Sequence, residues 1–359
     1  MNEASIFRLL FFTVLIALAL VPGLTWLCQK IGLVDRPLRE PHKQHNNTVP
    51  LSGGLVVFLS FLLVTTVLGV WNDSRTYPVL AGMAIIFLLG LVDDRISLPP
   101  GVKFAGQILA AAVVISGGEQ VRLFHEQALN IALTIFWLVG ITNAFNFVDS
   151  MDGLALGLGA ITSGFFVLVT MASQQYLLTQ SSVVLLGACL SAYYFNAQPA
   201  RIFLGDSGSQ FLGFALAIIG LDYAPLGYSP LASWYVPILL LGVPIFDTCL
   251  VVFSRLRRGQ PVYQARLDHI YHRLVHNGWS SNRSILTIHF AALLLDCLAF
   301  IALNAPPLIA NLIFAGVFIL GALAIAILDG ARFGFAAGPT PSRPPEAARS
   351  APPSGPEIQ

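Results

Sequence analysis

Four oxygen-bearing side chains recur at every third position in the run NAFNFVDSMD, which lies between two long apolar stretches. Residues three apart are neighbours on a helix surface, so we expect Asn143, Asn146, Asp149 and Asp152 to line one helix face. Amide and carboxylate oxygens suit hard cations, and polar groups beside apolar membrane segments are costly to keep. The stripe therefore predicts a site for a hard cation and phosphate oxygens.

Two adjacent carboxylates, Asp93 and Asp94, end another apolar stretch. Adjacent helical residues point about 100° apart, so the two can serve different partners. Carboxylates at a helix C-terminus oppose the macrodipole, which favours a functional role over an ordinary solvated terminus. Lys103 follows a Pro-Pro-Gly turn signal. It either faces phosphate across that short loop or is an interfacial lysine whose ammonium group reaches water.

A glycine-rich segment, FLGDSGS at 203–209, precedes a further apolar stretch. Gly205 and Gly208 would let backbone amides approach a ligand closely, and Asp206 lies where a helix is expected to begin. The alternative is that Asp206 or Ser207 is simply the N-cap of that helix.

Residues 265–277 are predicted to form an amphipathic helix at the membrane interface. Its apolar positions are Leu267, Ile270, Tyr271 and Leu274, and its cationic positions are Arg266, His269, Arg273 and His276, with His272 near the edge. The neighbouring arginines disfavour zinc at the two histidines of the HIYH run. Anion binding is the functional interpretation, and attachment to an anionic lipid surface is the alternative.

Three weaker signals remain. A loop with Lys43 and His45 precedes Gly53 and Gly54; a cytoplasmic loop alone would explain its charge, whereas the double glycine indicates close packing or phosphate approach. Asp247 lies within an apolar stretch after a proline. It is a functional candidate by position, or it serves a carbonyl freed by the proline or bonds the adjacent threonine.

Composition defines the class of protein. The 359 residues are 56% hydrophobic and only 10% charged, with a mean hydropathy of +0.75. This predicts an all-α polytopic integral membrane protein. We expect about eleven transmembrane helices, at 5–27, 52–71, 78–92, 103–117, 129–147, 153–171, 180–197, 209–221, 232–253, 285–304 and 307–328.

The cations indicate the orientation. If the 28–51 loop is cytoplasmic, only Arg8, Arg75 and Arg122 fall on the other side, which leaves 16 of the 19 lysines and arginines cytoplasmic. The positive-inside rule then places the N-terminus outside, the C-terminus in the cytoplasm and the polar loops on the cytoplasmic face. We expect residues 1–330 to form one transmembrane domain and the Pro- and Ser-rich residues 331–359 to form a disordered cytoplasmic tail.

Taken in order, five motifs resemble those of the polyprenyl-phosphate N-acetylhexosamine-1-phosphate transferases. They are VPLSGG at 49–54, VDDR at 92–95, NAFNFVDSMDGL at 143–154, FLGDSGS at 203–209 and DHIYHR at 268–273. The resemblance implies transfer of a sugar 1-phosphate from a UDP-N-acetylhexosamine, GlcNAc above all, to undecaprenyl phosphate, with release of UMP. The resemblance further implies that this reaction initiates a lipid-linked cell-envelope glycan, such as O-antigen or teichoic acid, at the bacterial inner membrane. The peptidoglycan-precursor branch has three consecutive histidines, so HIYH favours a simple UDP-HexNAc donor over UDP-MurNAc-pentapeptide.

The resemblance also implies roles for individual residues. The expected metal is magnesium, with manganese as a substitute, on Asp206, Asn146 and Asp94. Asp93, Asp94, Asp206 and Lys103 form the expected catalytic set, in which Asp93 acts as a base or orients the acceptor. Substrate binding is expected from Asp149, Asp152, Asn196, Phe203, Arg266, His269, His272, Lys43 and His45, with the Phe203 ring on uracil.

The expected partners are UDP-N-acetylhexosamine, undecaprenyl phosphate and membrane lipid, without nucleic acid, and a homodimer is expected by analogy. The alternatives are a phospho-MurNAc-pentapeptide translocase-type enzyme, a CDP-alcohol phosphatidyltransferase and a transporter. A CDP-alcohol phosphatidyltransferase lacks support, because its Asp-x-x-Asp-Gly motif continues with Ala-Arg and a second pair of aspartates. Here Gly153 is followed by neither. A transporter predicts ionisable groups near the membrane midplane, whereas most carboxylates here gather at helix ends.

Overall fold

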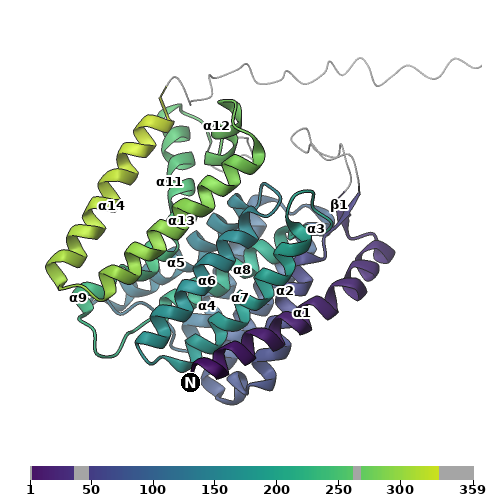
Figure 1. The fold of residues 1–359 in the computed structure, drawn as a ribbon, viewed down its shortest axis with the longest axis horizontal. Coiled ribbons are helices and arrows are strands. Elements are labelled where there is room, and N and C mark those ends of the chain that lie inside the picture. The colour runs from purple at the N-terminus through teal and green to yellow at the C-terminus, as the bar shows by residue number, and fades with distance from the viewer. Residues whose placement is uncertain (1, 36–47, 262–267, 331–359) are drawn as a thin grey trace, which may run out of the picture.

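The computed structural model describes residues 2–35, 48–261 and 268–330. Within these ranges the chain is a bundle of helices with one two-stranded antiparallel ladder, in which Val34 pairs with Pro50 and Asp35 with Val49. In Figure 1 the N-terminus lies at one end of the bundle, and α12 and β1 lie at the other. The predicted tail at 331–359 and the site residues Lys43, His45 and Arg266 lie outside the described residues.

The elements follow one another as a series of long helices joined by short connections. Their bounds are α1 Glu3–Ile31, β1 Val34–Asp35, β2 Val49–Pro50, α2 Gly53–Val67, η1 Val70–Asn72, η2 Ser74–Thr76, α3 Tyr77–Ile96, α4 Pro100–Ser116, α5 Gln127–Val148, α6 Leu154–Ala172, α7 Tyr176–Asn196, α8 Gly205–Leu221, α9 Pro230–Ser233, α10 Val236–Leu240, α11 Gly242–Arg257, α12 Ile270–His276, α13 Ser281–Leu303 and α14 Pro307–Leu328.

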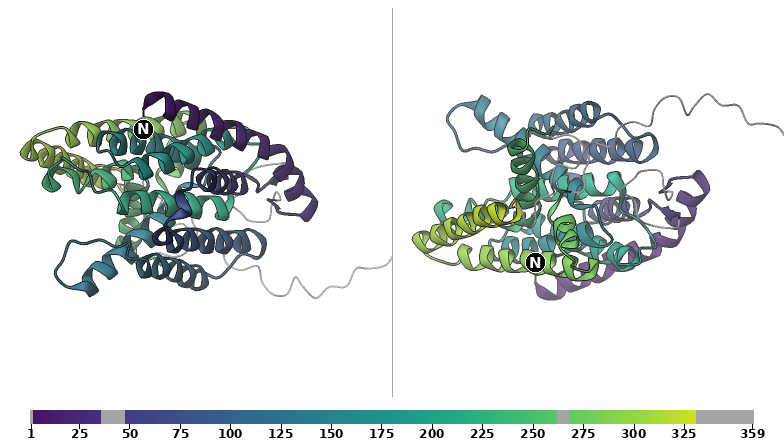
Figure 2. Two further views of the ribbon diagram at one scale, coloured as in Figure 1. Left: turned by 90° about the horizontal axis from the view of Figure 1, so that it is seen from below. Right: turned by 90° about the horizontal axis from the view of Figure 1, so that it is seen from above.

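Six helices in the described part of the chain are long and apolar enough to cross a membrane: α1, α5, α6, α7, α13 and α14. The helices α2 and α4 are apolar but shorter. An all-α, multi-pass membrane protein is therefore confirmed, whereas the count of about eleven spans stays a prediction. The two views of Figure 2 place α1 at one edge of the bundle and the blue α3–α4 hairpin at the opposite edge.

The predicted span at 232–253 is not one helix, because the chain breaks at Leu241 between α10 and α11. Pro244 has no backbone N–H, so it leaves the carbonyl of Leu240 without its helical donor. Thr162 of α6 donates its hydroxyl to that carbonyl at 2.9 Å. One non-functional role considered for Asp247 was to serve the carbonyl freed by Pro244. That role is excluded, because the partner of this carbonyl is Thr162.

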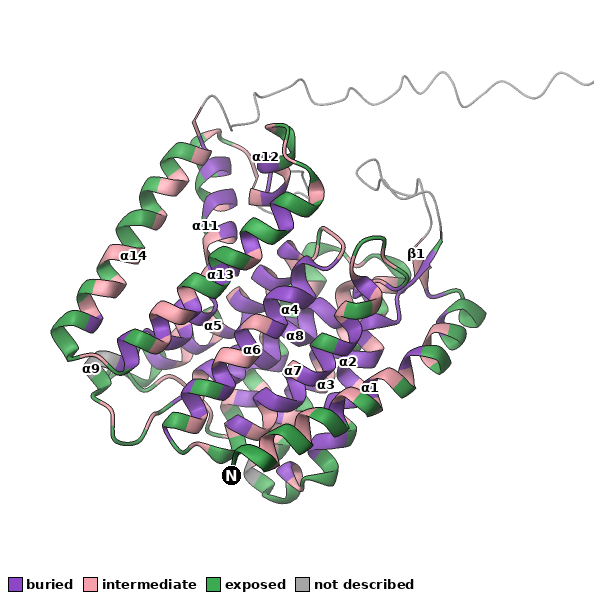
Figure 3. Ribbon diagram, viewed as in Figure 1, coloured by how far each residue is buried: buried purple, intermediate pink, exposed green. Residues whose placement is uncertain are grey.

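Helix α8 forms the centre of the bundle. Every residue from Ser207 to Gly220 is buried, and α8 packs against α3, α5 and α2. The contrast with α14, on which only Ala310 is buried, is visible in Figure 3. The N-terminal end of α8 therefore lies among neighbouring helices, and its backbone groups must find partners within the protein.

Glycines let three helices meet at this end of α8. A Cβ on Gly54 of α2 would lie 2.5 Å from the backbone nitrogen of Gly208, and one on Gly90 of α3 would lie 2.5 Å from the carbonyl oxygen of Asp206. The amide of Gly54 also donates to the Leu204 carbonyl at 2.9 Å. Of the two alternatives for the double glycine, close packing is thus confirmed.

We predict that Gly54→Ala lowers the stability of the folded protein, because the contact at this position is with backbone that cannot rotate away. The expected loss is about 1–3 kcal/mol, the usual cost of overpacking. Gly140→Ala is the matched control, since it also lies within a helix but its added Cβ meets nothing within 4 Å. Thermal unfolding in lipid nanodiscs measures both variants. Equal melting temperatures for the two would contradict the prediction.

Candidate active site

A lysine and two carboxylates meet where the α3–α4 hairpin approaches α8. Asp93 lies in the last turn of α3, and its side chain forms an ion pair with Lys103 of α4. The Lys103 ammonium nitrogen also lies 3.4 Å from Oδ2 of Asp206. The amide of Leu98 donates to Asp93 at 2.7 Å, which holds the turn between α3 and α4. Lys103 therefore belongs to a charged cluster, and the alternative of a purely interfacial lysine is wrong.

Asp94 accepts hydrogen bonds from the first amides of α8. Its two oxygens lie 2.7 Å from the nitrogen of Asp206 and 3.1 Å from that of Ser207. A carboxylate at a helix N-terminus satisfies free donors and complements the macrodipole. Gly205 has a φ of +73°, and a Cβ there would lie 2.8 Å from Asp94. The cap of α8 thus comes from α3, so the alternative that Asp206 or Ser207 is simply the N-cap of this helix is wrong.

The predicted polar stripe is divided by the end of a helix. Helix α5 stops at Val148, so only Asn143 and Asn146 share a helix face. The side-chain amide nitrogen of Asn146 donates to the carboxylate of Asp206 at 2.6 Å and to the hydroxyl of Ser209 at 3.0 Å. The expectation that all four side chains line one face is therefore wrong, because the chain turns at residues 149–153.

Asn143 lies deeper and turns towards α4. Its amide nitrogen donates to Gln107 at 2.7 Å, and Gln107 donates in turn to Gln210 at 3.1 Å. Gln107 and Gln210 are buried. This chain of amides links α4, α5 and α8 beneath the charged cluster. Sequence reasoning missed Gln107 and Gln210, although two glutamines within apolar stretches were a signal.

Asn196 and Asp152 connect the start of α6 to the loop before α8. Asn196 accepts from the amide of Gly153 at 2.9 Å and donates to the carbonyl of Ile202 at 2.9 Å. Asp152 accepts from the amide of Ala200 at 3.1 Å. These contacts give both side chains a structural role, and substrate binding by them stays a prediction.

The predicted uracil contact, Phe203, lies in the same loop. Its backbone amide donates to the carbonyl of Pro50, and its carbonyl accepts from the amide of Gly53, both at 2.9 Å. Its half-buried ring packs against a cluster that includes Leu33 and Leu51. The loop is thereby fixed to β2 and the start of α2, and the role of the ring stays a prediction.

Asp149 is the C-terminal cap residue of α5, outside the membrane-spanning segment. Burial raises its pKa well above the usual range, and the negative charges of Asp206, Asp94 and Asp152 raise it further. An ionised Asp149 is thus unfavourable in the protein without bound cations. A concentration of negative charge at this position is suited to binding a cation.

The histidine motif lies over the end of α5. The ring of His269 is 5.6 Å from that of Phe147, and the ring of His272 is 6.0 Å from that of His269. Nδ1 of His269 lies 2.7 Å from Oδ2 of Asp247. Asp247 therefore belongs to this corner of the site. Sequence reasoning treated it as a candidate but found no partner for it.

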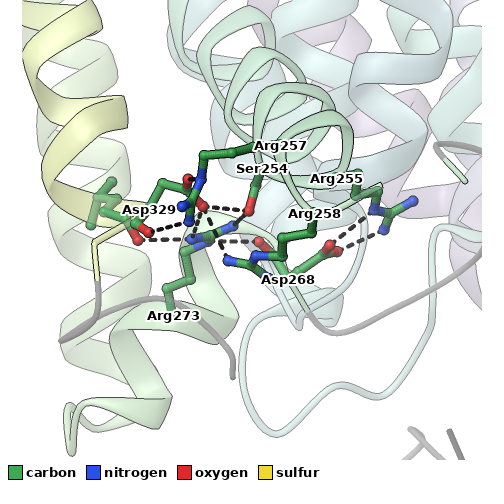
Figure 4. A network of polar contacts seen from close by, with 8 residues as sticks. Ser254, Arg255, Arg257, Arg258, Asp268, Arg273 and Asp329 are labelled. Atoms are coloured by element: carbon green, nitrogen blue, oxygen red, sulfur yellow. Dashed lines mark hydrogen bonds and ion pairs between the residues drawn. The ribbon is translucent and has the colours of Figure 1, made fainter. Parts of the chain in front are cut away.

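The predicted cationic face of α12 is wrong for Arg273, which is fully buried. Figure 4 shows Arg273 within a network of polar contacts. It donates to the carbonyls of Asp268 at 2.8 Å and Leu328 at 2.7 Å, and to the hydroxyl of Ser254 at 2.9 Å. Arg255 binds the Asp268 carboxylate through two nitrogens, at 2.9 and 2.6 Å. These bonds fasten α12 to α11 and α14.

Asp329, directly after α14, completes the network in Figure 4. It accepts from Ser254 at 2.6 Å and from Arg258 at 3.0 Å, and it pairs with Arg257. Burial alone would raise the pKa of Asp329, but bonds from Ser254 and Arg257 and the arginine charges lower it below the usual value. The ionised form is therefore the stabilising one.

The donor set fits a magnesium ion that is held partly by substrate. Among the described residues, no three His, Cys, Asp or Glu side chains gather as a metal cluster. Magnesium needs only one or two protein carboxylates when phosphates and waters complete its shell. Asp206, with about a third of its side chain exposed, and Asn146 beside it can supply such ligands. Both oxygens of Asp94 already accept backbone bonds, so Asp94 as a third ligand stays a prediction.

Comparison with known proteins identifies the family. Residues 76–224 match the model of glycosyl transferase family 4. The chain is 33% identical over 305 residues to a Bacillus subtilis protein named "Probable undecaprenyl-phosphate N-acetylglucosaminyl 1-phosphate transferase", covering 82% of this chain and 84% of that one. This protein belongs to that family of membrane glycosyl transferases, which confirms the family inferred from its motifs.

Two further relatives support the assignment. A decaprenyl-phosphate N-acetylglucosaminephosphotransferase of Mycobacterium tuberculosis is 32% identical over 300 residues, or 73% of this chain and 74% of that one. The phospho-N-acetylmuramoyl-pentapeptide-transferase of Bacillus subtilis is 29% identical over 318 residues, or 80% and 93%. The chain therefore covers most of the length of each relative, including the region of the site.

We predict that Asp149→Asn raises the thermal stability of the metal-free protein at pH 7. Because folding raises the pKa of Asp149, its favourable contribution is complete below the unfolded pKa of about 4 and is lost as the pH rises through the folded pKa. Asparagine removes the penalty, so we expect a gain of a few degrees at pH 7 and none near pH 4. Identical melting of variant and parent at pH 7 would refute this account.

We predict that Arg273→Ala destabilises the corner formed by α11, α12 and α14. Removing one partner from a buried charged network costs about 3–5 kcal/mol, because the remaining groups are left without their donors. Hydrogen exchange of α12 amides measures the effect. Arg283→Ala is the control, since Arg283 is exposed and only stacks on Trp279 at 4.3 Å. Equal exchange in both variants is the result that would speak against a structural role for Arg273.

Proposed function

We propose that this protein transfers N-acetylglucosamine 1-phosphate from UDP-GlcNAc to undecaprenyl phosphate and releases UMP. The observation that carries the proposal is the convergence of Lys103 and Asn146 on Asp206, with Asp94 holding the helix on which Asp206 lies. The names of the more similar relatives supply the donor sugar and the polyprenyl acceptor. A donor carrying MurNAc-pentapeptide is the second candidate, from a relative of lower identity.

The proposed reaction exchanges one phosphoanhydride for another. An oxygen of the lipid phosphate attacks the β-phosphorus of the UDP-sugar, the bond between the α- and β-phosphates breaks, and its electron pair leaves with UMP. A phosphate monoester is already largely ionised at neutral pH, so a strong general base is not required. Positioning and charge stabilisation then account for most of the catalysis.

The side chains of the cluster have separate tasks in this proposal. Lys103 binds phosphate oxygens by charge-assisted hydrogen bonds. Asp93, as the ion-pair partner of Lys103, orients that ammonium group and thereby the acceptor phosphate. Asp206 and Asn146 would hold magnesium, which when bound neutralises charge on the diphosphate and the departing UMP.

The membrane helices place the active site where the lipid acceptor can reach it. A polyprenyl chain is entirely apolar, so it stays in lipid while its phosphate reaches the polar end of the bundle. The distribution of lysines and arginines supports the cytoplasmic face of the bacterial inner membrane for this end. The donor is a water-soluble nucleotide sugar, and it would approach from that face.

We predict that purified protein releases UMP from UDP-GlcNAc when undecaprenyl phosphate and magnesium are both present, and that EDTA stops the release until magnesium is restored. Asp206→Ala should lower the rate at least about 100-fold, the usual effect of removing a group that stabilises developing charge. A panel of UDP-sugars, scored for UMP, also identifies the donor.

Asp222→Asn is the control, because Asp222 follows the opposite end of α8. We expect it to keep most of the activity. A folded parent protein that releases no UMP from any UDP-sugar would exclude the proposed reaction. Retention of activity by Asp206→Ala at ordinary magnesium concentrations would instead exclude the metal-binding role of Asp206 alone.

A further inference from the structure

A buried carboxylate in α11 holds both the first amide of α12 and the first ring of the histidine motif. Asp247 is 1% exposed. Its Oδ1 accepts from the backbone amide of Ile270 at 2.7 Å, and its Oδ2 lies 2.7 Å from Nδ1 of His269. A carboxylate can only accept, so Nδ1 carries the proton in this bond. Asp247 thus fixes where α12 begins and how the His269 ring is turned.

His269 is placed at the site by this contact. It precedes α12 in extended conformation, with φ −69° and ψ 162°, and its side chain is 11% exposed. Its ring lies 5.6 Å from that of Phe147, the residue that follows Asn146 at the end of α5. The ring therefore lies at the end of α5 that also carries Asn146, which is the end of the bundle where the donor diphosphate is proposed to bind.

The second oxygen of Asp247 is not needed to start α12. One acceptor satisfies the Ile270 amide, and burying a full carboxylate is costly unless both oxygens are paired. The nearby arginines have other carboxylates, since Arg255 pairs with Asp268 and Arg257 with Asp329. A purely structural cap would be supplied as well by an amide or a hydroxyl. A role in capping α12 therefore does not explain why the second oxygen of Asp247 lies within hydrogen-bond distance of the His269 ring.

We propose that Asp247 is a positioning residue that binds His269 through Nδ1 and turns Nε2 towards the diphosphate of the donor. This inference rests on the proposed function. Since Nδ1–H is engaged by Asp247, Nε2 is the nitrogen left for substrate, and in the imidazolium form it donates to a phosphoryl oxygen. The negative charge of Asp247 balances that imidazolium in a buried place. No proton needs to be transferred.

The test uses Asp247→Asn in the full-length protein in lipid nanodiscs. Asparagine keeps an oxygen for the Ile270 amide but offers an NH2 group to the ring, so Nδ1 has to accept a hydrogen bond in place of donating one, and only Nε2 can then carry a proton. We expect the KM for the UDP-sugar to rise about 10- to 100-fold with kcat nearly unchanged, as for a charged hydrogen bond made equally in ground and transition states. The ¹⁵N resonances of His269 should show that Nδ1 no longer carries a proton.

The double variant Asp247→Asn with His269→Gln should raise KM no further than His269→Gln alone, because both changes remove one interaction. Should Asp247→Asn fail to fold, His269→Gln still tests the role of the ring in donor binding: an unchanged KM overturns the proposal. Asp329→Asn is the control, since it weakens the attachment of α12 without contacting His269. It should leave the ¹⁵N resonances of His269 in place.

Unchanged His269 resonances in Asp247→Asn would overturn the proposal, as would additive effects on KM in the double variant. These results leave the proposed function intact, because the parent protein still releases UMP. If the parent releases no UMP from any donor, the proposed function fails and the diphosphate role of His269 fails with it. The ¹⁵N spectra then decide separately whether the Asp247–His269 bond exists in the membrane.

Discussion

The start of α8 lies packed among other helices, and the need to satisfy its backbone shapes the site. A helix leaves its first amides without internal partners, and an unpaired backbone donor at such a position is costly. Asp94 supplies the acceptors from α3. Gly54 and Gly90 allow α2 and α3 to come within reach of the α8 backbone. The same arrangement brings Asp206 next to Lys103 and Asn146, so helix packing and the proposed chemistry depend on one set of contacts.

A second set of contacts holds the histidine motif in place. Helix α12 has seven residues and is too short to be stable alone. Buried polar residues compensate for this: Asp247 binds its first amide, Arg273 ties it to α11 and α14, and Asp329 ties the end of α14 to the same arginine-rich corner. In each of these contacts the buried charged group has a partner, either a side chain of opposite charge or a backbone group that forms a hydrogen bond with it. Asp247 and the anchoring of α12 therefore fix the position of His269.

Negative charge is concentrated at the site in the protein alone. Asp93, Asp94, Asp149 and Asp206 lie close enough to influence one another, and Lys103 is the cation among them. Such an arrangement costs stability without a cation and is repaid on binding one, which is common where function and stability conflict. This imbalance supports a ligand that brings its own metal and phosphates.

The sequence alone was sufficient for the class of protein, the approximate helix positions and the family. Long apolar stretches are stable in lipid or packed inside a helix bundle, and the motifs of the site keep their spacing along the chain. It was also sufficient to predict that Asp93 and Asp94 would have different partners, because adjacent helical residues point in different directions.

Only the tertiary structure decided which polar residues meet. Asp94 accepts from an amide in the first turn of α8 that belongs to a residue 112 positions later, and Asp247 binds a ring 22 positions away, on the far side of residues 262–267 in the sequence. Periodicity describes neighbours within one helix, so it could not foresee such partners. It also extended the stripe of Asn143 to Asp152 past the point at which α5 ends. Pairing between distant residues depends on how whole helices pack, and that is a property of the folded bundle.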